Sequence, residues 1–292
     1  MIKSGAKHIL YQFIAVLALL TLPAMSRAQF VVTDTIRPGR IEVRSPQYGI
    51  ALFNTLDTYL GGGCHTGLAL HFSNEKFRDA RTGSYRWKYQ RILSTSIGYA
   101  TQENDLQLTG LIGYSWGGYH PFKVAKGLSL LAGVQLQVEG GAIYNPSGGN
   151  NPASAKLRTA LAASGMAIYR FPVREKNWIA RYQLDIPLIG AMFAPQFGQS
   201  YYEIFGLGHA KGVVAFTHPG NAPSSRHILT VDIPLKAGRH STTLRLSYTA
   251  DIYQSDINET RCHIYRNAFT LGFTRTILKI KAENKLMHYS PY

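Results

Sequence analysis

The stretch DLQLTGLIGYSW, residues 105–116, alternates apolar with polar or small side chains. Five of its six apolar residues fall on one face: Leu106, Leu108, Ile112, Tyr114 and Trp116. Successive side chains of a β-strand point to opposite faces, so this period of two predicts a strand with one apolar and one polar face. The stretch is informative about the whole fold because the same pattern returns along the chain.

The alternation recurs at 127–139, 178–186 and 242–252. The polar faces of these segments carry charges of both signs together with amides: Gln135, Gln137, Glu139, Arg181, Gln183, Asp185, Arg245 and Asp251. If the strands form a barrel, this set faces the lumen. It would then either pair internally and close the bore, or line a narrow polar path.

The N-terminus has the features of an export signal. Lys3 and Lys7 precede an apolar run at 9–25, and small residues follow at 26–28. This order predicts a signal peptide over 1–28, cleaved after Ala28. After that point the chain has no run of about 18 apolar residues, the length that a membrane-spanning helix needs. The mature chain is therefore expected to be an exported soluble protein or a membrane β-barrel.

Strand length and aromatic content favour the barrel over a soluble β-sandwich, which would give the same alternation. The apolar runs reach about 10 residues, which matches a bilayer crossing by a tilted strand. Aromatic residues near the ends of the runs resemble an interfacial girdle: Trp116, Tyr119, Trp178, Tyr201 and Tyr202. We therefore expect an all-β, antiparallel transmembrane β-barrel.

The segments divide the chain into a leader, one barrel domain and short flanks. A periplasmic lead-in is expected at 29–46, the barrel at 47–275 and a C-terminal tail at 276–292. About twelve strands are expected, including short pieces at 199–206 and 211–217. Ten is the alternative count if those pieces are not part of the wall. An even count places both termini of the chain on the periplasmic side.

The stretch ALHFSN, residues 69–74, resembles the His-x-Ser-Asn motif of outer-membrane phospholipases and lipid A deacylases. By periodicity His71 and Ser73 share a face, as a general base and a nucleophile would. That face is the polar one, which points to the lumen and away from lipid, and Asn74 falls on the opposite face. A lipid hydrolase using His71 and Ser73 is therefore the alternative, and we expect a protein that is not an enzyme.

The formal net charge is +15, and removing the predicted leader takes away three basic residues and no acid, leaving +12. A basic exported protein is expected to meet anionic neighbours. We therefore expect contact with outer-membrane lipids and lipopolysaccharide, with a small polar or anionic solute as a further candidate, and no nucleic acid. The scattered histidines predict no metal site, and no cofactor is expected.

The chain has two cysteines, Cys64 and Cys262. They open the second and the last expected strand at the same rim, with one strand between them. Two strand spacings amount to about 9–10 Å, whereas a disulfide tolerates Cα separations of up to about 7 Å. A bridge would require the first strand to stop short, which 61–63 (GGG) would permit. Two free thiols are the alternative.

Three stretches resemble a known family: YGIALFNTLDTYL (48–60), IYNPSGGNNPASAKLRTALAASGMAIYRF (143–171) and PLIGAMFAPQFGQSYYEIFGLG (187–208). The family is an uncharacterised one of outer-membrane β-barrels, a domain of unknown function found in Bacteroides-type bacteria. The resemblance implies an outer-membrane barrel and brings no catalytic residues. The expected role is that of a narrow pore, or of a closed barrel with a structural or surface-binding function.

Overall fold

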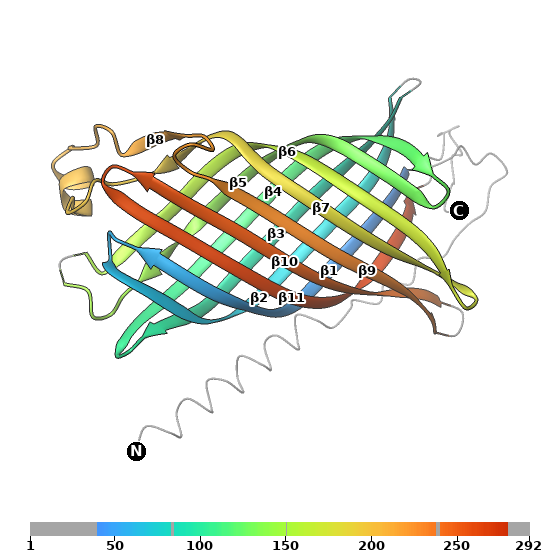
Figure 1. Ribbon diagram of the computed structural model, residues 1–292, viewed down its shortest axis with the longest axis horizontal. Coiled ribbons are helices and arrows are strands. Elements are labelled where there is room, and N and C mark those ends of the chain that lie inside the picture. The colour runs from blue at the N-terminus through green and yellow to red at the C-terminus, as the bar shows by residue number, and fades with distance from the viewer. Residues whose placement is uncertain (1–39, 83–84, 150, 238–239, 280–292) are drawn as a thin grey trace, which may run out of the picture. The chain divides into compact units, whose positions relative to one another are not determined.

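A computed structural model describes residues 40–82, 85–149, 151–237 and 240–279. Ten long antiparallel strands form a closed barrel in the described part of the chain (Figure 1). Their bounds are β1 (Arg40–Asp57), β2 (Gly61–Thr82), β3 (Tyr85–Gln102), β4 (Asp105–Ala125), β5 (Leu128–Tyr144), β6 (Ala153–Val173), β7 (Lys176–Phe193), β9 (Ser224–Ala237), β10 (His240–Ile257) and β11 (Thr260–Lys279). Each strand pairs with its neighbours in chain order, and β11 closes the barrel against β1.

The expected fold class is confirmed, and the wall holds the alternative count of ten strands. The piece at 199–206 is not a strand, because Tyr202–Gly206 forms a short π-helix, η1. The piece at 211–217 shortens to β8 (Val214–Thr217), which pairs with the end of β7. Gly208 and Gly212 adopt positive φ angles of 76° and 82°. The left-handed backbone at Gly212 turns the chain inside the piece expected at 211–217, and that at Gly208 turns it between the two expected pieces.

We call the two ends of the barrel the loop end and the terminal end. The loop end carries the connections 58–60, 103–104, 145–152, 194–223 and 258–259. At the terminal end β1 begins and β11 finishes, and the turns 126–127 and 174–175 are tight. The strands extend from Arg40 to Lys279, past both ends of the expected range 47–275. β2 continues to Thr82 because its residues 66–82 pair with β3.

The outer surface of the barrel is apolar over a broad belt, as the alternation predicted. Large apolar side chains stand outward on every long strand, for example Ile50, Leu70, Ile97, Ile112, Val134, Leu161, Ile189, Leu229, Leu246 and Phe269. The inward positions between them are mostly polar and buried. An apolar outer face with a polar interior is the arrangement of a membrane β-barrel. No helix among the described residues is long and apolar enough to span a membrane.

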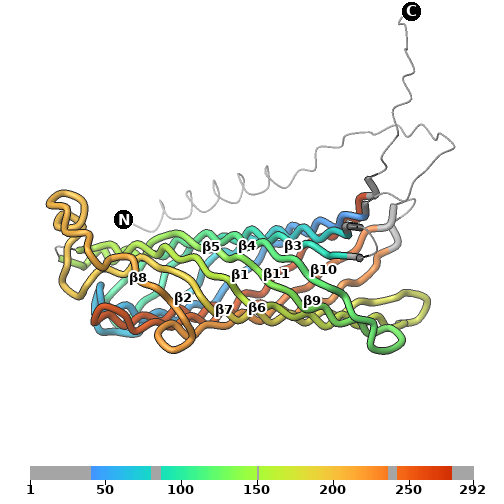
Figure 2. Tube along the Cα trace, turned by 90° about the horizontal axis from the view of Figure 1, so that it is seen from above, coloured from blue at the N-terminus to red at the C-terminus, as the bar shows by residue number. Residues whose placement is uncertain are grey.

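The wall is least regular between β7 and β9. These strands pair from Ile179 to Asp185. Beyond that point Pro187, which has no N–H to donate, lies at a register shift against β6. Nearer the loop end, Gly190–Phe193 of β7 pair with β8 instead. The long connection 194–223 therefore arises at this place, and Figures 1 and 2 show it at the loop end.

Candidate functional site

An ion pair crosses the interior between β2 and β7, which lie five strands apart in either direction around the barrel. Arg181 donates two hydrogen bonds to the Glu75 carboxylate, at 2.6 Å (Nη1–Oε1) and 2.8 Å (Nη2–Oε2). Arg245 contacts the same carboxylate and donates to both oxygens of Asp232 at 2.6 Å. All four side chains are buried. Two bidentate pairs joined through Glu75 therefore fill the lumen at this depth.

Amides and a tyrosine fill the adjoining layer. The Gln90 amide donates to Glu75 at 2.6 Å and to Gln183 at 2.8 Å. The Tyr119 hydroxyl donates to Gln90 Oε1 at 2.9 Å, and Gln135 Nε2 donates to Tyr119 at 3.2 Å. None of these four polar side chains has appreciable exposure to solvent. Because each amide supplies both donors and acceptors, the layer links the charged groups on either side of it.

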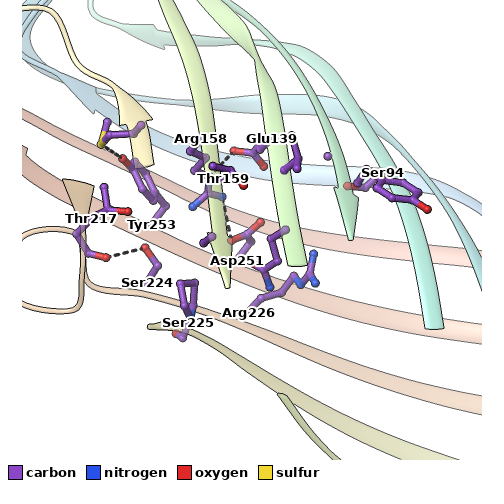
Figure 3. A pocket seen from close by; sticks show the side chains of 18 of the residues that line it. Ser94, Glu139, Arg158, Thr159, Thr217, Ser224, Ser225, Arg226, Asp251 and Tyr253 are labelled. Atoms are coloured by element: carbon purple, nitrogen blue, oxygen red, sulfur yellow. Dashed lines mark hydrogen bonds and ion pairs between the residues drawn. The ribbon is translucent and has the colours of Figure 1, made fainter. Parts of the chain in front are cut away.

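A second opposed pair joins β11 to β5 nearer the loop end. Arg266 Nη2 lies 3.3 Å from Glu139 Oε2 and also binds Asp251. Arg158 donates from Nε to Glu139 Oε1 at 3.0 Å, and its guanidinium lies 4.3 Å from the centre of the Tyr253 ring. Figure 3 shows Arg158 between Glu139 and Asp251. The cavity lined by these residues measures about 50 Å³, room for a few water molecules.

A third opposed pair closes the mouth at the loop end. Lys156 on β6 and Asp57 on β1 lie 2.7 Å apart (Nζ–Oδ2), on strands five apart around the wall. The Asp57 side chain is almost fully buried, and that of Lys156 largely so. Ion pairs therefore connect opposite walls at three depths of the described barrel.

The connection 194–223 lies against this mouth. Tyr59 donates its hydroxyl to the Gln199 carbonyl at 2.7 Å, and the Tyr201 hydroxyl accepts the Ala155 N–H at 2.7 Å. Asn258 holds the connection from the β10–β11 turn by donating to the Ala194 carbonyl at 2.5 Å. Burial raises the pKa of Tyr59 to about 12, with smaller contributions from Tyr201 and Asp57. At neutral pH Tyr59 is thus protonated and able to donate.

The predicted lumen set is inward-facing as expected, and it pairs internally. Glu75 was not among the residues predicted from the sequence, and neither were the partners on other strands: Gln90, Arg158, Arg226, Asp232 and Arg266. Arg226 belongs to the same network, donating to Asp185 at 2.9 Å and to Gln135 at 2.5 Å. The girdle assignment of Tyr119 was wrong, since its ring is fully buried in the lumen. Its odd spacing from the outward Trp116 was the signal that would have placed it inside.

His71 and Ser73 both lie on the lumen side, as the periodicity predicted. His71 is buried, and its Nδ1 lies 2.8 Å from the Ser96 hydroxyl on β3. Ser73 and His71 line a second cavity of about 30 Å³ together with Glu75, Arg181 and Arg226. In this arrangement the imidazole faces a serine on another strand, inside a polar core with room for only a few water molecules.

The two cysteines are free thiols. Leu56 pairs with Cys64 and Asp57 pairs with Cys262, so β1 lies between them as expected. Cys262 points inward and is buried, whereas Cys64 is exposed on the outer face. Because their side chains leave opposite faces of the wall, the structure selects the alternative of two thiols over the bridge.

No group of three or more potential metal-ligating side chains is present among the described residues. The charged side chains of the lumen are instead engaged with one another. The arrangement can hold the wall together and exclude solutes, and it offers buried water sites in two small cavities.

The fold and the interior together define a membrane β-barrel filled by its own polar side chains. The chain belongs to the family described as a protein of unknown function, DUF3316, whose model matches residues 12–284. This confirms the expected membership of an uncharacterised family, while the Bacteroides-type origin stays a prediction. No match is found among the curated proteins.

Solved structures with a similar fold are outer-membrane barrels. The outer membrane protease OmpT from Escherichia coli is 8% identical, with 84% of this chain and 99% of that chain covered and a TM-score of 0.44. The transport unit of the autotransporter AIDA-I from Escherichia coli is 10% identical, with 88% and 94% covered and a TM-score of 0.39. An outer membrane channel from Pseudomonas putida is 10% identical, with 85% and 100% covered and a TM-score of 0.36.

Proposed function

We propose that this protein is an outer-membrane β-barrel with a sealed lumen, whose role depends on the surface it presents at the loop end and not on transport through its interior. The observation that carries the proposal is the bidentate pair of Glu75 with Arg181 between opposite walls. A ten-stranded barrel lies between eight-stranded barrels, whose interiors side chains fill, and porins, which leave an aqueous channel. Long charged side chains supply the extra volume that ten strands require.

Placement in the outer membrane is part of the proposal. The outward apolar belt supports a membrane location, and the predicted leader over 1–28 supports export. The terminal end would then face the periplasm and the loop end the cell exterior, the topology usual for bacterial barrels with an even number of strands. Outer-membrane lipids and lipopolysaccharide are the partners that follow from this placement. A small polar solute is not favoured, since the two lumen cavities have room for only a few water molecules each.

A lid-gated pore is the competing role, because the connection 194–223 covers the mouth. The two roles differ in what happens when that cover is removed. In a gated pore the lumen would open, whereas in a sealed barrel the three opposed ion pairs would still close it.

Solute entry into proteoliposomes separates the two roles. Vesicles containing the wild-type chain and vesicles containing a variant with 197–211 replaced by a short Gly-Ser linker are mixed with an impermeant sugar, and swelling is followed by light scattering. We expect both to swell no faster than protein-free vesicles. Swelling by the loop variant alone would establish a lid-gated pore, and swelling by both would establish an open one; either result overturns the proposal.

A further inference from the structure

The loop end carries an apolar strip on its outer side, formed by Phe193, Phe205, Val214 and Phe216. The Phe193 ring stacks on that of Phe205 at 6.2 Å, with 12° between their planes. Phe193 also pairs with Val214 across the β7–β8 ladder, so both side chains point to the same face. Val214 and Phe216 alternate outward on β8. The four residues therefore form a continuous surface, which we call the aromatic strip.

The strip is highly exposed for an apolar surface. Phe205 is 73% exposed, Val214 69% and Phe216 63%, whereas the large apolar side chains that are exposed on the long strands have exposed fractions between 37% and 59%. A contiguous exposed apolar surface on a protein marks an interaction site. The strip therefore requires an explanation beyond the scattered apolar residues that any surface carries.

The aromatic strip continues the lipid-facing belt of β7. Leu188 and Ile189 stand outward on that strand, 47% and 50% exposed, and the ladder from Gly190 to Phe193 leads from them directly to β8. The rim over β1, β10 and β11 differs. There, outward positions close to the loop end are polar, and they bind one another: His263 Nε2 lies 2.7 Å from Asn54 Oδ1, and Gln254 donates to the Tyr265 hydroxyl at 2.5 Å.

The strip is also held in place from the inside of the mouth. The Tyr201 ring stacks on Phe193 and Phe205, each at 6.2 Å with planes within 15°. Its hydroxyl accepts the Ala155 N–H on the edge of β6. Tyr201 thus fixes the π-helix that carries Phe205 to the wall, so the exposed rings are presented in a fixed arrangement.

We propose that the aromatic strip lies in the outer leaflet of the membrane, at the boundary between lipid acyl chains and head groups. Continuity with the belt identifies lipid as the occupant, and the position of the strip at the loop end identifies the shallow boundary. Aromatic side chains concentrate at that depth in membrane barrels. The inference rests on the proposed outer-membrane placement and extends it, because it assigns a lipid-contacting function to the β7–β9 connection.

Quenching of tryptophan by brominated lipids tests this placement. Phe205→Trp is made in a full-length chain whose Trp87, Trp116 and Trp178 are changed to Phe, and the protein is reconstituted in phosphatidylcholine vesicles brominated near the head group or near the chain ends. Ile189→Trp on the belt is the positive control. Asn104→Trp, in the exposed β3–β4 turn of the same rim, is the negative control.

We expect head-group-proximal bromines to quench Phe205→Trp at least half as strongly as Ile189→Trp, and several-fold more than Asn104→Trp. Bromines near the chain ends should quench it less. If the tryptophan-free background fails to fold, as judged by heat-dependent gel migration, the same substitutions are compared in the wild-type chain by difference.

Quenching of Phe205→Trp no stronger than that of Asn104→Trp would overturn the proposal. If weak quenching were accompanied by dimers on chemical cross-linking, and if these dimers were absent in Phe205→Ser/Phe216→Ser, the strip would contact a second copy of the chain instead of lipid. Neither result depends on whether the lumen conducts. The lipid contact of the strip can therefore be disproved while the sealed barrel holds, and the sealed barrel can be disproved while the lipid contact holds.

Discussion

Glu75 on β2 and Arg181 on β7 face each other across the full width of the barrel and meet in a bidentate ion pair at 2.6 and 2.8 Å. Arg245 completes the charge balance by joining Glu75 to Asp232. An ion pair between opposite walls does two things. It occupies the lumen, and it makes strands that are not neighbours depend on one another for stability.

The first prediction concerns Glu75. Glu75→Gln leaves two buried guanidinium groups without their shared carboxylate, and breaking a buried pair costs about 3–5 kcal/mol. We expect the midpoint of urea unfolding in detergent to fall accordingly. The matched control is Asp256→Asn, which removes an exposed pair with Arg261 worth less than about 1 kcal/mol. Equal effects of the two substitutions would show that Glu75 does not support the wall.

The thiols give a second prediction. Under denaturing, non-reducing conditions we expect alkylation of two cysteines per chain, since both are free. In the folded protein Cys64 should react quickly and Cys262, which is buried, slowly. Mass spectrometry of the alkylated peptides distinguishes the two. A chain with no reactive thiol before reduction would mean that the cysteines are bridged, and that β1 does not separate them.

Raising the pH should loosen the mouth through Tyr59. Its pKa is raised from 10.0 to about 12 in the folded protein, so the folded state holds this proton more tightly than the unfolded chain. The contribution of Tyr59 to stability is therefore complete below pH 10 and is lost as the pH rises through about 12. We expect cleavage within the connection 194–223 by subtilisin, a protease that stays active at alkaline pH and does not require a lysine, to accelerate over that range in the wild type. In Tyr59→Phe, cleavage should already be faster at pH 8 and change less with pH.

A structural feature could be predicted from the sequence when the residues that determine it lie close together along the chain. Alternation such as that around Leu136 and Gln135 is local, so fold class and lumen-facing residues followed from it. The partner of Arg181 did not follow, because Glu75 lies 106 positions away and the pairing depends on register and strand tilt. The piece at 199–206, which carries Phe205, was expected to be a strand, but it lies outside the wall and forms a π-helix.

A fourth prediction addresses the hydrolase alternative. His71 Nδ1 lies 2.8 Å from the Ser96 hydroxyl and is separated from lipid by the wall, so acyl chains have no access to it. We expect no phospholipase or deacylase turnover by the purified protein, with or without calcium. A turnover lost in both His71→Ala and Ser73→Ala would reverse this conclusion.

Planar-bilayer recording tests the sealed lumen most directly. The pure wild-type barrel, its insertion checked by gel migration, is recorded beside Arg181→Ala/Arg245→Ala, which removes the two longest side chains of the central layer. We predict no stepwise conductance from the wild type over repeated insertions, and small conductance steps from the variant if it folds. Regular, reproducible steps from the wild-type protein would contradict the account, because they would require a continuous aqueous path where Glu75 and Arg181 meet.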